Sequence, residues 1–106
     1  MSDLMKQIRL AAEQEPKTVS QQFLKLMEEV GESSQAYLSS QHASGSGYKQ
    51  LTTANTKEEL TDVLLVTLAI LHKLGTTDEE LATLVSTKTA KWLSKQDHLT
   101  SKKDDK

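Results

Sequence analysis

Two short acidic motifs hold the residues of this sequence best suited to chemistry. Glu29-Val30-Gly31-Glu32 and Glu59-Leu60-Thr61-Asp62 each place two carboxylates three residues apart. In a helix, residues at this spacing lie about 60° apart around the axis and about 4.5 Å apart along it. Both carboxylates of each motif therefore face the same way.

Antiparallel packing of the two motif-bearing helices would bring four carboxylates into one volume, where their repulsion requires a cation. Carboxylate oxygens are typical ligands of Mg²⁺, with Mn²⁺ as a substitute, rather than of zinc. Magnesium sites usually keep several waters and are completed by substrate phosphates. The predicted metal ligands are Glu29, Glu32, Glu59 and Asp62. The competing interpretation is that this spacing is also common on solvated helix faces.

One glycine interrupts the first motif. Gly31 stands in the interior of an expected helix, where glycine costs about 1 kcal/mol relative to alanine. Its position predicts a close approach of backbone or ligand.

Four helices are expected to position the motifs. The first starts with Ser2 as N-cap and ends before Pro16, and the second starts near Thr18, which has capping-box spacing with Gln21. The third starts at residue 55 or 56, with a glutamate of its first turn at the capping position, and ends at Gly75 as its C′ residue. The expected ranges are about 2–14, 18–38, 55–74 and 77–95.

The fourth helix is expected to start at Thr77, with Glu80 three residues on. Its apolar residues recur at helical spacing and are expected to face inward; they are Leu81, Leu84, Val85 and Trp92. Between the second and third helices, residues 39–55 are rich in Ser, Gly and Thr and predict a long loop or lid, in which Tyr48 is the expected contact.

Composition bounds the class of protein. The chain has 106 residues, no cysteine, one proline and a net charge of −2. These values predict one small helical domain over residues 1–96, with a disordered polar tail over 97–106. Disulfides and thiolate metal sites are excluded, no basic footprint indicates a nucleic-acid partner, and no segment indicates a membrane partner. A cytoplasmic location is expected.

The third helix carries an apolar stretch from Val63 to Leu71 that covers nearly every helix face. Such a helix must be buried on all sides, and a domain of this length has few helices with which to cover it. The predicted fold is therefore all-α, a four-helix-type bundle completed by assembly into a homodimer or homotetramer. The alternative is that the first, second and fourth helices of the same chain cover the third.

Residues 26–32, Leu-Met-Glu-Glu-Val-Gly-Glu, and residues 57–64, Lys-Glu-Glu-Leu-Thr-Asp-Val-Leu, followed by a basic helix, resemble the MazG-like all-α nucleoside triphosphate pyrophosphohydrolases. The resemblance covers about residues 18–95. It implies a helical bundle that binds Mg²⁺ through the four carboxylates named above. It also implies hydrolysis of (deoxy)nucleoside triphosphates to nucleoside monophosphate and pyrophosphate, a task of nucleotide-pool house-cleaning.

The family's C-terminal pattern, Lys-x-x-Lys-Asn-x-x-Arg, falls on residues 88–95 of this chain. Lys88 and Lys91 match it, and the resemblance implies that they bind the substrate. Trp92 and Lys95 replace the asparagine and the arginine, and a lysine lacks the bidentate fork of arginine.

The mechanism expected from the resemblance uses Mg²⁺ to bridge the triphosphate and to position a water for in-line attack. Either Glu28 or Glu32 would orient that water as a base. Glu28 lies about 100° around the helix from Glu29, so exposure to solvent is its competing interpretation.

Two other classes of protein compete with this hypothesis. A di-iron or di-manganese carboxylate bundle normally uses a Glu-x-x-His pair, and neither acidic motif has a histidine three residues on. A non-enzymatic helical interaction module would leave the acidic positions solvated and use the apolar third helix for assembly. A specific response to magnesium would separate the enzyme from the module.

Overall fold

The computed structural model describes residues 2–41 and 52–104. These residues form four helices and no strand: α1 Ser2–Gln14, α2 Val19–Ser40, α3 Thr53–Lys73 and α4 Asp78–Asp104. The all-α prediction is therefore confirmed. The chain divides into two compact units, Met1–Gly75 and Thr76–Lys106, where the sequence predicted one domain over residues 1–96. Each unit is described by itself.

Side chain–backbone hydrogen bonds set the starts of α2 and α3. The predicted capping box is present at α2, where Thr18 N donates to Gln21 Oε1 at 2.9 Å and Gln21 N donates to Thr18 Oγ1 at 3.1 Å. A second capping box, between Thr52 and Asn55, starts α3 two residues before the predicted start at residue 55. The prediction of a glutamate at this capping position is wrong, because Asn55 occupies it.

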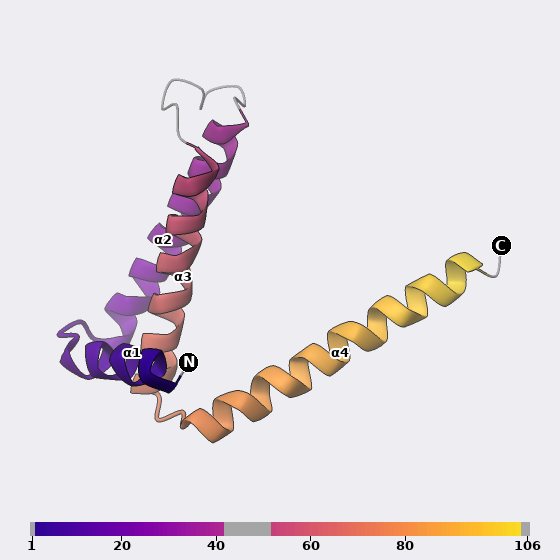
Figure 1. Ribbon diagram of the computed structural model, residues 1–106. Coiled ribbons are helices and arrows are strands. Elements are labelled where there is room, and N and C mark those ends of the chain that lie inside the picture. Colours follow the sequence, from indigo (N-terminus) through magenta and orange to yellow (C-terminus); the bar gives the residue numbers. More distant parts are fainter. Residues whose placement is uncertain (1, 42–51, 105–106) are drawn as a thin grey trace. The chain divides into compact units, whose positions relative to one another are not determined.

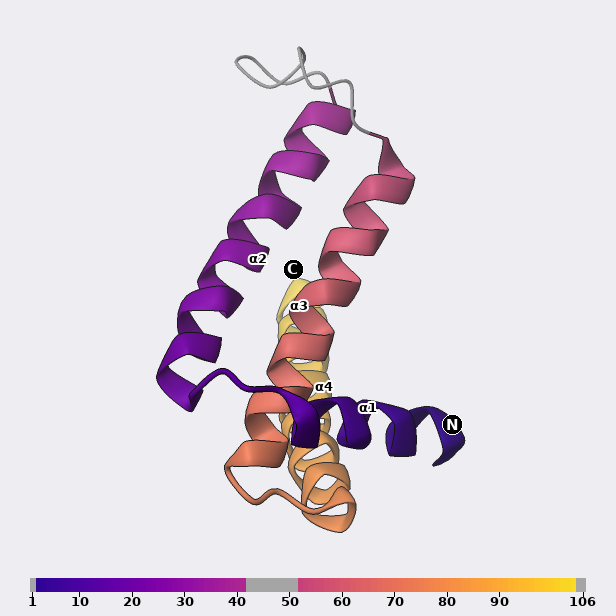
Figure 2. The same ribbon diagram turned by 90° about the vertical axis from the view of Figure 1, so that its left-hand side faces the viewer.

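In the first unit, α3 packs against both α2 and α1. Figure 2 shows α2 and α3 side by side and antiparallel, with α1 crossing the C-terminal half of α3. Polar contacts tie that end of α3 to α1 and to the α1–α2 connection. His72 Nε2 lies 2.7 Å from Glu13 Oε1, and Lys73 Nζ donates to the backbone oxygen of Glu15 at 2.8 Å and to that of Lys17.

The end of α3 follows the sequence prediction. Gly75 has a φ of 83°, a left-handed conformation that a side chain would strain, and its N–H donates to the oxygen of His72 at 2.9 Å. The antiparallel packing of α2 and α3 places the acidic stretch of α3 beside α2.

The first unit buries few apolar side chains. The buried apolar residues among those described are Ala12, Ala36 and Ile70. On the apolar stretch of α3, Leu64 is 55% exposed and Leu65 is 40% exposed. The complete burial that this stretch requires is thus not achieved by the described part of one chain.

The second unit contains α4. Thr77 accepts a hydrogen bond from Glu80 N at 3.1 Å, as the sequence predicted. Within this unit, Leu84, Val85 and Trp92 are exposed. The helix runs to Asp104, so the polar tail predicted from residue 97 lies within α4 up to that residue. No glycine or proline follows Gly75 in the sequence, so polar composition alone does not end this helix.

The predictions of a long loop and of no membrane-spanning segment concern only partly described regions of the chain. The central part of the expected loop, with Ser44-Gly45-Ser46-Gly47 and Tyr48, lies outside the described residues. Among the helices that are described, none combines the length and the apolar character needed to cross a bilayer.

Candidate metal centre

Three of the four predicted ligands meet between α2 and α3. Glu29 from α2 and Glu59 and Asp62 from α3 each offer one carboxylate oxygen, and these oxygens lie within 4.8 Å of one another. Glu29 is buried, Glu59 is half-buried and Asp62 is exposed. Oxygens bound to one Mg²⁺ at about 2.1 Å lie at most about 4.2 Å apart, so small side-chain rotations would bring all three onto one ion. The three residues could therefore hold a metal ion.

Glu32 lies beside this group rather than within it. Burial raises the pKa of Glu59 above its usual value, and the negative charges of Glu32 and Asp62 add to the shift. A hydrogen bond with Glu32 and the charge of Glu29 raise this pKa further. All four predicted carboxylates thus interact at Glu59, and their repulsion disfavours its charged form.

Two oxygens of the cluster are buried without a hydrogen-bond donor. They are Oε2 of Glu29 and Oε2 of Glu59. A buried carboxylate oxygen without a donor or a cation is unfavourable, because it has lost its hydration. A metal ion between α2 and α3 would supply the missing positive partner to both. This observation is independent of the spacing of the three carboxylates.

Lys25 is a residue of the site that the sequence analysis missed. Its Nζ lies 3.0 Å from Glu29 Oε1, and this hydrogen bond, followed by the negative charges of Glu29 and Glu28, raises the pKa of Lys25. The available signal was the i,i+4 spacing of the two residues on α2. Glu29 therefore uses one oxygen for Lys25 and leaves the other, Oε2, for a further cation.

The remaining predicted site residues are Glu28 in the first unit and two lysines in the second. Glu28 is exposed on α2, and Lys88 and Lys91 are exposed on α4 in the second unit. The close approach predicted at Gly31 is not found among the described residues, because a Cβ there would meet no atom within 4 Å. This glycine therefore has no packing explanation within the described chain.

The resemblance to the MazG-like pyrophosphohydrolases depends on the motif residues alone, because the comparisons with known proteins found no match. No family model matches the chain, and no match was found among curated proteins or solved structures.

Proposed function

We propose that this protein is a metal-dependent pyrophosphohydrolase, which hydrolyses (deoxy)nucleoside triphosphates to nucleoside monophosphate and pyrophosphate. The observation that carries the proposal is the convergence of Glu29, Glu59 and Asp62 within 4.8 Å, with two buried oxygens that lack a donor. Oxygen-only ligands favour Mg²⁺, with Mn²⁺ as a substitute. The biological task would be house-cleaning of the nucleotide pool.

The carboxylates and their neighbours supply distinct roles in this proposal. A bound Mg²⁺ would supply neutralisation of the phosphate charge and a coordinated water for in-line attack. Of the two candidate bases, Glu32 is favoured over Glu28, because the charge of Glu32 acts on Glu59 and raises its pKa, which places Glu32 beside the cluster. Lys25 would hold one oxygen of Glu29 through their ion pair and orient this carboxylate beside the metal position. Lys88 and Lys91 remain the proposed contacts to the substrate.

We also propose that the working form is a homodimer or homotetramer. Large apolar side chains remain exposed on both units, among them Leu64 on α3 and Trp92 on α4. Exposed apolar surface of this extent is typical of protein–protein interfaces. The same observation favours the second candidate function, a non-enzymatic helical interaction module, which would assemble without need of the carboxylates.

A nucleotide panel tests the reaction. The protein is incubated with ribo- and deoxyribonucleoside triphosphates, with and without Mg²⁺, and the released pyrophosphate and orthophosphate are measured separately. We expect monophosphate and pyrophosphate only when Mg²⁺ or Mn²⁺ is present. Release of orthophosphate would indicate a different phosphohydrolase chemistry, and no turnover of any nucleotide would favour the interaction module.

A further inference from the structure

Lys25 is the cation that the structure places at the carboxylate cluster. Its Nζ lies 3.0 Å from Glu29 Oε1, and the negative charges of Glu28 and Glu32 also act on it. An ammonium group has three N–H donors, and the pair with Glu29 needs only one of them. Lys25 can therefore bind a second acceptor beside the cluster.

The two side chains of this ion pair differ in their exposure. The side chain of Glu29 is 6% exposed, whereas that of Lys25 is 40% exposed. The carboxylate is thus held between α2 and α3, and its partner remains accessible to a solute. An anion that approaches the cluster from water can reach Lys25 without any movement of the helices.

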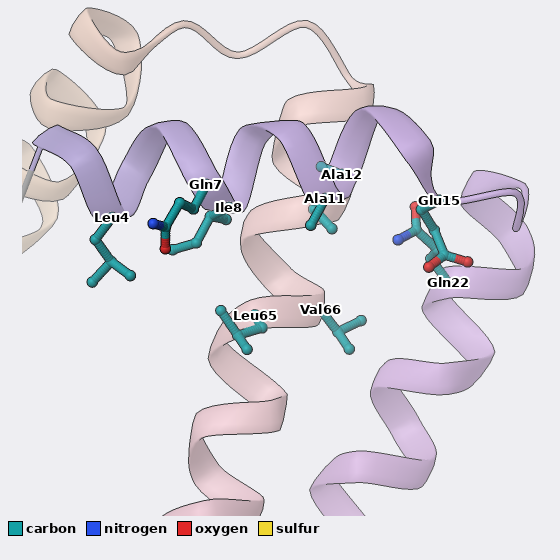
Figure 3. A pocket seen from close by; sticks show the side chains of 10 residues that line it. Leu4, Gln7, Ile8, Ala11, Ala12, Glu15, Gln22, Leu65 and Val66 are labelled. Carbon is teal, nitrogen blue, oxygen red and sulfur yellow. The ribbon is translucent and has the colours of Figure 1, made fainter.

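Two pockets flank the cluster, and the described residues that line them include no lysine, arginine or histidine. One pocket, of about 380 Å³, lies where α1 crosses α3, and Figure 3 shows Gln22 of α2 at one end of it. The other, of about 470 Å³, includes Ser33. Along α2, Gln22 lies seven residues before Glu29 and Ser33 lies four residues after it. A polyphosphate at the cluster would therefore find a cation at Lys25 rather than in either pocket.

The charge balance of a metal-loaded cluster also calls for a further cation. Glu29, Glu59 and Asp62 carry three negative charges when they are deprotonated, and one Mg²⁺ balances two of them. The remaining charge would repel a polyphosphate, and the charge of Glu32, which acts on Glu59, would add to the repulsion. The ammonium of Lys25 offsets one negative charge and lowers this barrier to binding.

We propose that Lys25 binds a phosphate group of the substrate once the metal is in place; this inference rests on the proposed function. In the metal-free protein the ammonium is paired with Glu29 Oε1, whereas Glu29 Oε2 is buried without a donor. A cation bound at Oε2 draws negative charge from this carboxylate and repels the ammonium, which weakens the pair. A phosphate oxygen then becomes the stronger acceptor, and Lys25 turns to it.

The test measures metal binding and phosphate binding separately, with inorganic pyrophosphate as the probe. Mn²⁺ binding is followed by electron paramagnetic resonance, and pyrophosphate binding to the Mn²⁺-saturated protein by calorimetry. The variants are Lys25→Met, Lys25→Arg and the control Lys6→Met, which removes the same charge from an exposed position of α1. Methionine and arginine are good helix formers, so all three variants should fold, and circular dichroism checks their helix content.

We expect Lys25→Met to bind pyrophosphate at least about tenfold more weakly, because a charge-assisted hydrogen bond is lost. Its affinity for Mn²⁺ alone should be unchanged or higher, because a positive charge beside the metal is removed. Lys25→Arg should keep pyrophosphate binding within about threefold, because the guanidinium also donates to phosphate. Lys6→Met should stay within about twofold, because an exposed and distant charge is screened.

A purely structural role of Lys25, in which it only orients Glu29, predicts the opposite pattern. Lys25→Met would then lose affinity for Mn²⁺, and the Mn²⁺-saturated variant would bind pyrophosphate as well as the unmodified protein does. This pattern would overturn the inference. An equal loss of pyrophosphate binding in Lys25→Met and Lys6→Met would overturn it as well, and so would an unmodified protein that binds no pyrophosphate at any Mn²⁺ concentration.

Turnover separates this inference from the proposed function. If the unmodified protein hydrolyses no triphosphate but pyrophosphate binding falls in Lys25→Met as expected, the phosphate contact stands and the proposed reaction fails. If triphosphates are hydrolysed, and neither pyrophosphate binding nor the KM for triphosphate responds to Lys25→Met, the reaction stands and the phosphate contact fails.

Discussion

The two faces of α2 differ in a way that reverses the usual rule of burial. On the face packed against α3, Gln22 and Glu29 are 4% and 5% exposed, whereas Leu24 and Met27 of the same helix are 67% and 72% exposed. Polar side chains are normally left in water unless they are paired, and large apolar ones are normally buried. The inner face thus carries the candidate metal centre, and the outer face carries exposed apolar surface, which we propose contacts another chain.

Replacing one ligand is the change expected to have the largest effect on the inner face. In Asp62→Asn, turnover of the preferred nucleotide with Mg²⁺ should fall by at least about 1,000-fold, because one negative ligand of the metal is lost. The matched control is Glu58→Gln, an exposed carboxylate one residue before Glu59. Circular dichroism should show unchanged helix content in both variants. Full activity of Asp62→Asn would refute the ligand assignment.

Exposed apolar surface also lies on α3, where a charge tests the proposed contact with another chain. Leu64→Asp should shift the protein to monomers in sedimentation analysis, because an unpaired carboxylate in a buried interface costs about 3 kcal/mol, or more than 100-fold in the dissociation constant. Ser20→Asp places the same charge at an exposed polar position of α2 and should leave assembly unchanged. A monomeric unmodified protein would contradict the proposed role of this surface.

Mg²⁺ should raise the free energy of unfolding through the carboxylates of the inner face, and this effect should not depend on the apolar residues of the outer face. At about 100 times its dissociation constant, a ligand that binds only the folded state adds about 2.7 kcal/mol to the free energy of unfolding. Thermal unfolding should therefore shift upward with Mg²⁺ and return to its original value after EDTA. Asp62→Asn should lose this shift and Leu64→Asp should keep it once its lower starting stability is subtracted. No response of the unmodified protein would favour the interaction module.

A smaller effect is expected from pH, through Glu59. Because its pKa is raised on folding, this group stabilises the metal-free protein fully below its usual pKa of 4.5 and loses that contribution as pH rises through the folded pKa. Metal binding requires the deprotonated carboxylate, so the stabilisation by Mg²⁺ should weaken as pH falls through the same range. In chemical unfolding titrations without metal, Glu59→Gln should remove the contribution of Glu59 to the pH dependence of the free energy of unfolding. An unchanged pH dependence in this variant would argue against a raised pKa of Glu59.

Local signals in the sequence predicted the elements well and their surroundings less well. The Thr18–Gln21 capping box and the left-handed Gly75 depend only on neighbouring residues, so both could be predicted. The start of α3 was placed too late, because the Thr52–Asn55 pair competes with the glutamates that follow and was not recognised.

The carboxylates of the site were predicted from the sequence, but two of their neighbours were not. Helical spacing identified Glu29, Glu59 and Asp62, since antiparallel packing is enough to bring them together. The ion pair of Lys25 depends on side-chain orientation within α2, and the burial of the Gln22 amide depends on how the helices of the first unit pack. The i,i+4 spacing of Lys25 and Glu29 was a signal for the ion pair that the sequence analysis did not use, whereas no sequence period predicts the burial of Gln22.

Titration with Mn²⁺, followed by electron paramagnetic resonance, tests the central claim most directly, because free and bound ions give different signals and no substrate is needed. We predict saturable binding to the unmodified protein and to Glu58→Gln, competition by Mg²⁺, and loss of binding in Asp62→Asn. Equal binding by the unmodified protein and Asp62→Asn, or no saturable binding by either, would contradict a metal centre at these carboxylates.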